Sequence, residues 1–295
     1  MLNPQNPEFS RNLGFMSLDD QETINNATVA IAGAGGDGGA LAIQLGRMGV
    51  GEIRLADPEV FEIENVNRQA CASKSTIGVN KARAVGVYIS DINPQIKIKV
   101  ETKGIQPSNI EAFVEGADLV IDETEFTTHA IGVAIARAAR AQNVPNLMAM
   151  NVGFGTNITT YHPEGKTLEA TLGLPEDMPI EEIAKQDVPI QNWLPYLPSY
   201  IDLDVFSAVA KGEKSAPSVA PGVSIAAGVA ATQAFLNLMK GNNNWPSPVY
   251  APKFLVVDAI DQKTMLTKYP KISFLKSYAK LVLSNKLGLN PKASY

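Results

Sequence analysis

Apolar residues along the first half of the chain alternate between short strand-like segments and segments with helical spacing. The strand-like segments are rich in Val, Ile, Leu and Ala, and they cover residues 27–32, 52–56, 96–101, 117–122 and 144–150. The segments between them place apolar side chains three and four positions apart, at 40–48, 81–91, 107–115 and 131–141. Strands that alternate with helices predict an α/β fold with a Rossmann-like, doubly wound, mainly parallel sheet.

The second half of the chain follows a different pattern. Residues 153–161 form another β-rich run directly after a predicted strand, and 254–258 and 264–269 favour two more. A long buried helix is expected at 219–240 and an amphipathic helix with Lys on its outer face at 273–284. We expect these strands to form an antiparallel C-terminal extension of the sheet.

Four segments of a single domain follow from these patterns. Residues 9–21 mix apolar and polar groups at helical spacing, with Ser17 as a suitable N-cap. The prolines within residues 163–217 exclude one continuous helix there. The segments are an N-terminal helical arm at 1–26, a Rossmann-like core at 27–162, a Pro-rich crossover at 163–217, and a C-terminal helix-strand-helix unit at 218–295 that completes the same domain.

Composition limits the partners and the compartment. The 295 residues carry a formal net charge of −5, which argues against an extended nucleic-acid-binding face, although a local basic pocket stays open. The longest apolar region, 219–239, contains Pro221, Gln233 and Asn237, so it favours a buried helix over a membrane span. The first residues lack the pattern of a signal peptide, and we expect a cytoplasmic protein without membrane contact.

The chain has one cysteine, Cys71, and two histidines, His129 and His162. These counts exclude an intrachain disulfide and a Cys-x-x-Cys zinc pair, and they disfavour a His-rich metal site. Chemistry in this protein is therefore expected to depend on carboxylates, basic side chains and backbone groups.

A glycine-rich turn follows the first predicted strand and opens the first long helix. Gly33, Gly35 and Gly38 have G-x-G-x-x-G spacing, which allows a tight turn and close approach of a phosphate to backbone N–H groups. By itself this turn does not distinguish NAD, FAD, SAM and ATP. Asp57 ends the second strand about 20 residues later, where a carboxylate binds ribose hydroxyls in such folds. Its alternative role is to cap the turn before Pro58.

A group of polar and basic residues lies beyond the second strand. Asn65, Arg68, Gln69 and Lys81 have no evident use in a dehydrogenase, which needs only the pyrophosphate and ribose of its cofactor held. A triphosphate under attack at its α-phosphorus does need them, because fixed cations stabilise the charge that develops on its oxygens.

Taken together, these motifs resemble the ThiF/MoeB/ubiquitin-activating-enzyme family of ATP-dependent adenylyltransferases. The resemblance rests on an Arg-containing N-terminal helix, the glycine loop, Asp57, the run Asn65-Val-Asn67-Arg68-Gln69 and the spacing Gly78-x-x-Lys81, and it covers roughly residues 9–162. It implies that residues 27–162 form an ATP-binding core. It also implies that the crossover at 163–217 contributes to the acceptor groove, although a subunit-packing arm or a plain insertion is an equal alternative.

The resemblance implies a role for each matching residue. Arg11 corresponds to an arginine that reaches the ATP site of the partner subunit, which implies a homodimer. Two matches have other interpretations: Lys81 on a solvated helix face, and Arg68 in an ion pair with Glu62 or Glu64. The implied catalytic residues are Arg11, Arg68, Lys81 and Glu125, and the implied ATP-binding residues are Gly33, Gly35, Gly36, Gly38, Asp57, Glu59, Asn65, Gln69 and Asp122.

The segment after the fourth predicted strand departs from the family pattern. Glu125 stands where the resemblance implies an Asp that positions Mg²⁺, and its additional methylene moves the carboxylate by roughly an ångström. Phe126 and His129 also differ from the usual residues, and His129 is expected on a helix face rather than as a base. Relatives with zinc carry two Cys-x-x-Cys pairs that this chain lacks, so we expect no zinc. We expect Cys71 to be a packed thiol.

We therefore expect ATP-Mg²⁺-dependent adenylylation of a carboxylate. In the family that it resembles, the acceptor is often the C-terminus of a ubiquitin-like or sulfur-carrier protein, and in one branch it belongs to a modified tRNA, which the acidic charge makes less attractive. The first alternative is a non-catalytic nucleotide-binding partner protein, motivated by Glu125 and by the missing cysteines. The second is an NAD(P)-dependent oxidoreductase, which would leave Arg68, Gln69 and Lys81 without a role.

Overall fold

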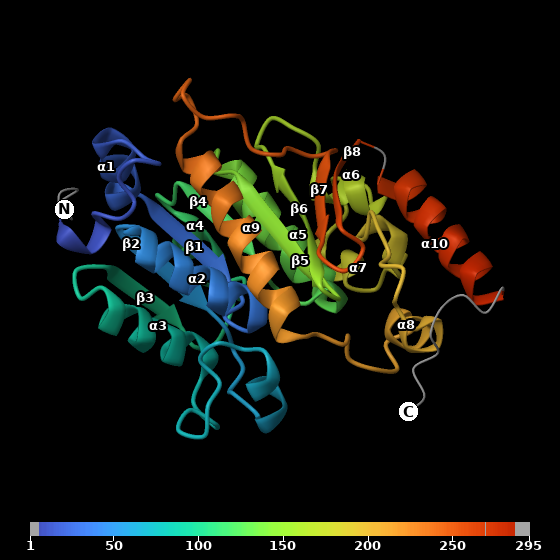
Figure 1. The fold of residues 1–295 in the computed structure, drawn as a ribbon. Helices are drawn as coiled ribbons and strands as arrows, with labels where there is room; N and C mark the ends of the chain where they lie inside the picture. Colours follow the sequence, from blue (N-terminus) through green and yellow to red (C-terminus); the bar gives the residue numbers. More distant parts are fainter. Residues whose placement is uncertain (1–5, 269, 287–295) are drawn as a thin grey trace.

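A computed structural model describes residues 6–268 and 270–286, and its centre is one eight-stranded sheet (Figure 1). The strand order is β3-β2-β1-β4-β5-β6-β7-β8, with parallel pairing from β3 to β5 and antiparallel pairing from β5 to β8. The predicted mainly parallel sheet with an antiparallel C-terminal extension is confirmed. The strands are β1 (Thr28–Ala32), β2 (Glu52–Ala56), β3 (Lys97–Glu101), β4 (Leu119–Asp122), β5 (Asn146–Val152), β6 (Gly155–Tyr161), β7 (Phe254–Asp258) and β8 (Lys263–Thr267).

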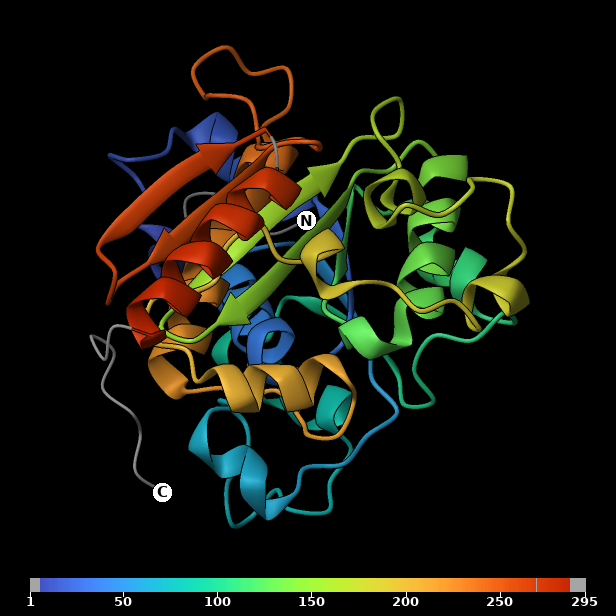
Figure 2. The ribbon, with the colours of Figure 1, turned by 90° about the vertical axis from the view of Figure 1, so that its right-hand side faces the viewer.

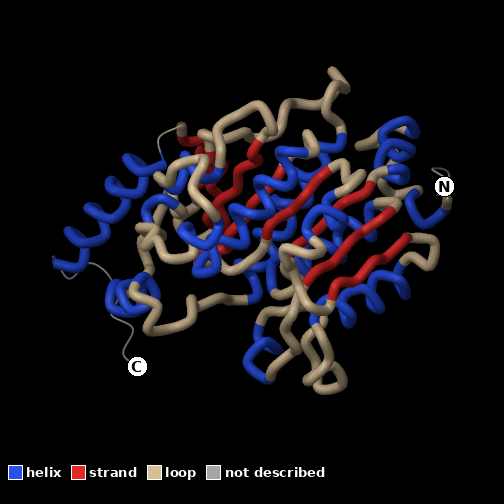
Figure 3. The backbone as a smooth tube through the Cα atoms, turned by 180° about the vertical axis from the view of Figure 1, so that it is seen from behind, coloured by secondary structure: helices blue, strands red, loops and turns tan. Residues whose placement is uncertain are grey.

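The strand order changes direction at β1. From β1 the chain passes outward to β2 and β3, and then returns to place β4 on the other side of β1. Ligands of open α/β sheets bind at this kind of reversal, beyond the carboxyl ends of the strands. The glycine loop leaves the carboxyl end of β1, and residues 123–125 leave that of β4, so the reversal brings these segments together. Figure 3 shows the strands side by side in the twisted sheet.

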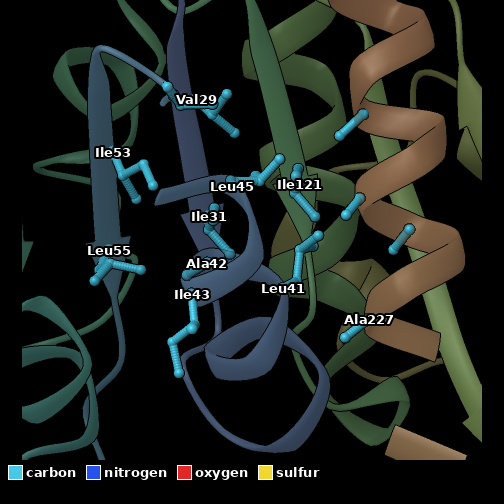
Figure 4. Close-up of a cluster of buried hydrophobic side chains, with 14 of the residues drawn as sticks. Val29, Ile31, Leu41, Ala42, Ile43, Leu45, Ile53, Leu55, Ile121 and Ala227 are labelled. Carbon is cyan, nitrogen blue, oxygen red and sulfur yellow. The ribbon is translucent and has the colours of Figure 1, made fainter. Parts of the chain in front are cut away.

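Helices cover both faces of the sheet. On one face, α2 and α9 pack over β1, β2 and β4, and their contacts bury Val29, Ile31, Leu41, Ile121 and Ala227 (Figure 4). On the other face lie α4, α5 and the crossover segment (Figure 2). The helices are α1 (Leu18–Asn26), α2 (Gly36–Met48), α3 (Lys81–Ile92), α4 (Ile110–Val114), α5 (His129–Ala141), α6 (Leu168–Leu172), α7 (Ile180–Ile183), α8 (Leu203–Ala210), α9 (Ala220–Leu238) and α10 (Pro270–Lys286).

The crossover segment consists of short helices that are interrupted by prolines, as the sequence predicts. Besides α6, α7 and α8 it contains the 3₁₀ turn η4 (Ile190–Asn192). Trp193, Leu194 and Leu197 from this segment are buried against Val133 of α5 and Tyr161 of β6. The crossover is therefore part of the core rather than a detached insertion.

The N-terminal segment confirms the predicted N-cap at Ser17 but departs from the helical arm predicted before it. A 3₁₀ turn, η1 (Pro7–Phe9), and two further turns occupy the region, and α1 begins only after Ser17. Ser17 and Asp20 form a reciprocal capping box that fixes this start. Gly14 has φ +106°, a conformation that a continuous helix does not contain. Arg11 thus lies in a turn and not in a helix.

The C-terminal helix α10 also differs from the prediction of an amphipathic helix. Lys271, Lys276 and Lys280 are exposed on α10 as predicted, but Leu275 and Leu283 are also more than half exposed. α1 and α10 lie at opposite ends of the molecule (Figure 1). Residue 269 of the predicted last strand, and residues 1–5 and 287–295 of the predicted terminal segments, lie outside the described residues.

Candidate functional site

Two glycines of the turn after β1 are required by backbone contacts. Gly33 has φ +98°, and a Cβ there would lie 2.4 Å from the carbonyl oxygen of Glu123. A Cβ at Gly38 would lie 2.1 Å from the carbonyl oxygen of Gly33. Gly35 and Gly36 are different, because a Cβ would meet only the side chains of Gln69 at 3.5 Å and Val223 at 3.4 Å. The first pair closes the loop against β4, and the second pair leaves the backbone open toward a ligand.

Asp57 connects the glycine loop to the end of β2. Its Oδ2 accepts a hydrogen bond of 2.8 Å from the backbone N–H of Ala34, and its Oδ1 accepts one of 2.8 Å from that of Glu59. Burial raises the pKa of this carboxyl, and the two N–H groups oppose that shift. The turn-capping contact is present, and ribose binding stays a prediction.

Lys81 is a buried cation at the first turn of α3. Its Nζ lies 2.5 Å from Oε2 of Glu59, whose side chain is 64% exposed. The interpretation of Lys81 as part of a solvated helix face is wrong, because only 8% of its side chain is accessible. Glu59 is thus the solvent-exposed partner of this buried cation.

The run 65–69 lies in the 3₁₀ turn η2 (Ile63–Asn67) and just after it. The suggested ion pair of Arg68 is absent from the described residues, because its Nη1 instead donates to the backbone oxygen of Glu64 at 3.2 Å and to Oδ1 of Asn67 at 2.8 Å. Oδ1 of the buried Asn65 accepts from the N–H of Glu62. Gln69 reaches the glycine loop, and its Oε1 is buried without a hydrogen-bond partner in the described structure.

The sequence reasoning missed Asp37, which lies in the first turn of α2. Its carboxylate accepts hydrogen bonds from the backbone N–H of Asn151 at 3.0 Å and from the Nδ2 of the same residue at 2.8 Å. Burial raises the pKa of Asp37 to about 6, although these bonds and the charge of Arg68 act in the opposite direction. An acidic residue inside a phosphate-type glycine loop was the available signal, since a carboxylate occupies the end of the helix that favours anions.

The segment after β4 contributes three acidic residues in different environments. Asp122 is 1% exposed and its Oδ1 accepts from the N–H and the hydroxyl of Thr124. Glu123 packs against the glycine loop, and its pKa is raised well above the usual value by burial and by the nearby charges of Asp37 and Asp122. Glu125 is exposed at the edge of a cavity that also reaches Asp122. Of the three side chains, Glu125 is the most exposed, Glu123 is half-buried and Asp122 is buried.

The described residues contain no group of three or more His, Cys, Asp or Glu side chains arranged to hold a metal ion. An exposed monodentate carboxylate such as Glu125 nevertheless suits Mg²⁺, which keeps several waters and takes further oxygens from phosphates. The donor set therefore fits a magnesium ion that arrives with a nucleotide.

Three other residues singled out in the sequence lie as follows. His129 begins α5, where its Nε2 lies 2.8 Å from the backbone oxygen of Ile183, so it is a helix residue packed on the crossover. Cys71 is buried, and burial raises its pKa to about 11, as expected for a packed thiol. Arg11 is exposed.

Arg11 lies far from the glycine loop of its own chain. The neighbouring Asn12 donates to Gln21, whose Nε2 donates to the backbone oxygen of Met48 at the last residue of α2. Because α2 has 13 residues, it separates its two ends by roughly 20 Å. Arg11 is at one end of this helix and the glycine loop is at the other, so Arg11 cannot complete the site of its own chain.

The described residues contain no helix that is long and apolar enough to cross a membrane.

A family model described as the ThiF family matches residues 9–275. The tRNA threonylcarbamoyladenosine dehydratase of Bacillus subtilis is 33% identical over 155 residues, which are 52% of this chain and 60% of that protein. The SAMP-activating enzyme E1 of Haloferax volcanii is 26% identical over 148 residues, 50% of this chain and 54% of that protein.

This chain therefore spans less than two thirds of the length of both relatives. Among solved structures, Escherichia coli MccB in a crystal structure with ATP superimposes with a TM-score of 0.64 and 20% identity. The superposition covers 90% of this chain and 72% of that chain, and it shows the same fold.

Proposed function

The chain belongs to the ThiF family, and from this premise we propose that it is an ATP-Mg²⁺-dependent adenylyltransferase that activates a carboxylate. The observation that carries the proposal is the placement of three groups just beyond neighbouring strands: the open glycine backbone after β1, the buried Lys81 whose charge acts on Asp57 after β2, and the exposed Glu125 after β4. Backbone N–H groups, a cation and a magnesium-binding carboxylate are the groups that phosphoryl chemistry requires.

In the proposed reaction, a carboxylate oxygen of the acceptor attacks the α-phosphorus of ATP. The bond between the α-phosphorus and the oxygen that leads to the β-phosphate breaks, and pyrophosphate leaves with the electron pair. The products are an acyl-adenylate and pyrophosphate. Magnesium, when bound, neutralises charge on the phosphate oxygens.

The residues of this chain orient the nucleotide and stabilise its charge. The backbone at Gly35 and Gly36 and the first turn of α2 bind phosphate oxygens, and Asp57 is close enough to the loop to accept from a ribose hydroxyl. When ATP binds, the ammonium group of Lys81 pairs with a phosphate in place of Glu59. Arg68 likewise leaves its uncharged hydrogen-bond partners in η2 and binds a second phosphate group.

Asn65 and Gln69 support this arrangement. Asn65 fixes the start of the turn that presents Arg68, because its side-chain oxygen accepts from the N–H of Glu62. The unpartnered oxygen of Gln69 lies beside Gly35 and accepts a hydrogen bond from the nucleotide. Asp122 acts indirectly, since its buried carboxyl holds Thr124 and so shapes the loop that carries Glu125.

The proposed acceptor is a C-terminal carboxylate of a ubiquitin-like or sulfur-carrier protein. Support comes from relatives named as a SAMP-activating enzyme E1 and as adenylyltransferases and sulfurtransferases. The Bacillus subtilis relative is named as a tRNA-modifying dehydratase, so a carboxylate on modified tRNA is the second acceptor class. The formal net charge of −5 favours the protein acceptor.

We propose a homodimer in which each Arg11 completes the site of the partner subunit. Arg11 is exposed and lies near the end of α2 that is opposite the glycine loop. A cation in that position contributes to ATP chemistry only across an interface.

ATP–pyrophosphate exchange tests the proposed function. We expect exchange with Mg²⁺ and an acceptor, and a loss of about 10²–10³ in Arg68→Ala, as for removal of one charge-stabilising donor. Lys276→Ala, which removes an exposed cation from α10 at the opposite end of the molecule from α1, is the control and retains exchange. ATP binding without exchange for any protein or tRNA acceptor would instead support a non-catalytic nucleotide-binding partner protein.

A further inference from the structure

Residues 262–295 carry a charge opposite to that of the protein as a whole. They contain seven lysines and no aspartate or glutamate, whereas the whole chain has a formal net charge of −5. Among the described residues, helix α10 (Pro270–Lys286) makes up most of this segment. A basic segment within an acidic chain indicates a surface that meets a negatively charged partner.

One face of α10 is packed on the body of the protein. Phe274 and Leu281 are buried, and the ring of Phe274 lies 6.4 Å from that of Phe206 in α8. The hydroxyl of Ser277 accepts a hydrogen bond of 3.0 Å from the backbone N–H of Leu197 in the crossover segment. These contacts fix the orientation of the helix, so its opposite face has a defined direction.

That opposite face is a stripe of apolar side chains that are open to solvent. Ile272, Leu275 and Leu283 are 52%, 58% and 58% exposed, and Ala279 is exposed between them. At about 100° per residue, these four positions fall within about 80° of one another and lie across the helix from Leu281. We call these four residues the α10 stripe.

Lysines border the α10 stripe on both sides. By the same helical spacing, Lys271 lies on one side of the stripe and Lys280 on the other. Both are exposed, and so is Lys286 in the last turn. The lysines of α10 form no ion pair within the described part of the chain. Their charges are therefore not neutralised by the protein itself.

A binding partner of α10 has to match both the lysines and the apolar stripe. A nucleic acid would match the lysines alone, because its proteins add hydrogen-bonding or aromatic side chains to the cations. Two copies of α10 would bring lysines together, since the helix contains no acidic residue. A stable interface with another protein takes about 20–30 residues from each side, and the α10 stripe is one narrow row on one helix.

We propose that α10 binds the surface of a membrane that contains anionic lipids. The helix lies parallel to the membrane, with the α10 stripe among the headgroups and upper acyl chains and the ammonium groups on lipid phosphates and carboxylates. It lies at one end of the molecule (Figure 1) and toward the viewer in Figure 2, where a flat surface reaches it. The expectation of no membrane contact considered only segments that span a membrane or direct secretion, and a helix that lies on the surface is neither.

Vesicle flotation of the full chain tests the proposal. The probes are vesicles of phosphatidylcholine alone and vesicles in which phosphatidylserine replaces about a third of that lipid. We expect at least tenfold tighter binding to the vesicles with phosphatidylserine, and weaker binding as the salt concentration rises, because salt screens exposed charges. Equal binding to both kinds of vesicle, or binding to neither, overturns the proposal.

Serine substitutions in the α10 stripe separate insertion from charge attraction alone. Leu275→Ser combined with Leu283→Ser should weaken binding to the phosphatidylserine vesicles at least tenfold, and the exposure of both side chains means that the fold is kept. Val87→Ser, at a 66% exposed position of α3 beside the opposite edge strand β3, is the control and binds like wild type. Undiminished binding by the leucine variant would show a purely electrostatic surface, as for nucleic acid, and overturns the proposal.

Charge reversal tests whether the lysines of α10 are the ones that matter. Lys271→Glu combined with Lys280→Glu should weaken binding at least tenfold. Lys74→Glu combined with Lys103→Glu makes the same change in net charge at exposed positions outside residues 262–295, and should bind nearly as well as wild type. Equal losses in the two pairs would assign binding to the overall charge of the protein and not to α10.

Leu275→Trp places an indole in the α10 stripe and reports its depth directly. Relative to wild type, we expect an added emission at shorter wavelength with phosphatidylserine vesicles, and its quenching by lipids that carry bromine in their acyl chains. An indole that is not quenched on bound vesicles lies outside the membrane and overturns insertion. Self-association without vesicles that the leucine variant abolishes, seen by sedimentation velocity, would assign the α10 stripe to a second copy of this chain and overturns the proposal.

Discussion

Asp37 in the first turn of α2 is held by Asn151, which lies 114 residues later near the end of β5. Asn151 in turn accepts from the hydroxyl of Ser218, and Asn67 donates to the backbone oxygen of Ser218. These contacts connect the glycine loop, the sheet extension and the end of the crossover. The same carboxylate also experiences the charge of Arg68, so the site's electrostatics depend on this connection.

Asp37→Asn is expected to change the pH dependence of stability. The folded-state pKa of Asp37, about 6, lies above its usual 3.8, so the folded state binds the proton more tightly than the unfolded state. The stabilisation is therefore fully present below pH 4 and is lost as the pH rises toward 6. In Asp37→Asn this fall, on the order of 2–3 kcal/mol, should disappear from the free energy of unfolding.

Urea unfolding at pH 4.5 and pH 7.5 measures the effect, with Asp19→Asn at an exposed position in α1 as the control. If the free energy of unfolding changes equally with pH in wild type and in Asp37→Asn, Asp37 is not the group responsible for the fall. Because the variant also removes a negative charge beside the phosphate-binding turn, its affinity for ATP at pH 7.5 should rise.

Alanine at the glycines should separate folding from nucleotide binding. Gly33→Ala and Gly38→Ala place a Cβ 2.4 and 2.1 Å from backbone oxygens, so we expect large losses of thermal stability. Gly35→Ala makes only an ordinary contact with Gln69 and should fold normally, yet bind ATP at least tenfold more weakly. Thermal unfolding and ATP titration distinguish the two effects, and a stable Gly33→Ala would show that the loop can move away from β4.

Lys81→Ala should lower pyrophosphate exchange by about 10²–10³, because a buried cation is lost from the phosphate site. Lys185→Ala is the control, since Lys185 also pairs with a glutamate but at an exposed position. ATP affinity and exchange rate are measured for both variants. Wild-type exchange in Lys81→Ala would mean that Lys81 serves only to hold Glu59.

Glu125→Gln should lower exchange at a fixed Mg²⁺ concentration at least tenfold, because the amide is a poor magnesium ligand. Glu125→Asp restores the shorter side chain that the family resemblance implies and should keep the magnesium dependence. Exchange is measured over a range of Mg²⁺ concentrations, together with ATP affinity in its absence. A parallel fall of metal-free ATP affinity in Glu125→Gln would point to a contact with the nucleotide instead.

Mixed dimers test the role of Arg11. Arg11→Ala and Arg68→Ala should each lose exchange alone, and an equal mixture should recover about a quarter of the wild-type rate. This recovery follows because random pairing gives one mixed dimer in about two, and each mixed dimer has one intact site of its two. If the mixture exchanges pyrophosphate no faster than either variant alone, Arg11 does not complete the ATP site of the partner subunit.

The sequence by itself determined the fold class and most elements. Apolar spacing placed β2 and β7 at their observed bounds, and it placed the other strands to within a few residues. This succeeds because the 2- and 3.6-residue periods reflect local burial in strands and helices. Ser17 was also correctly placed as an N-cap, whereas Gly14 with its positive φ interrupts the helical spacing that precedes it.

The sequence also indicated which residues gather around the glycine loop, because the carboxyl ends of parallel strands meet at one edge of the sheet. Only the tertiary structure decided their environments: Lys81 is buried, Glu125 is exposed and Asp122 is buried. Asp37 meets Asn151 across a long stretch of chain. Burial and pairing of this kind depend on how the layers pack, and no local period in a single sequence encodes that packing.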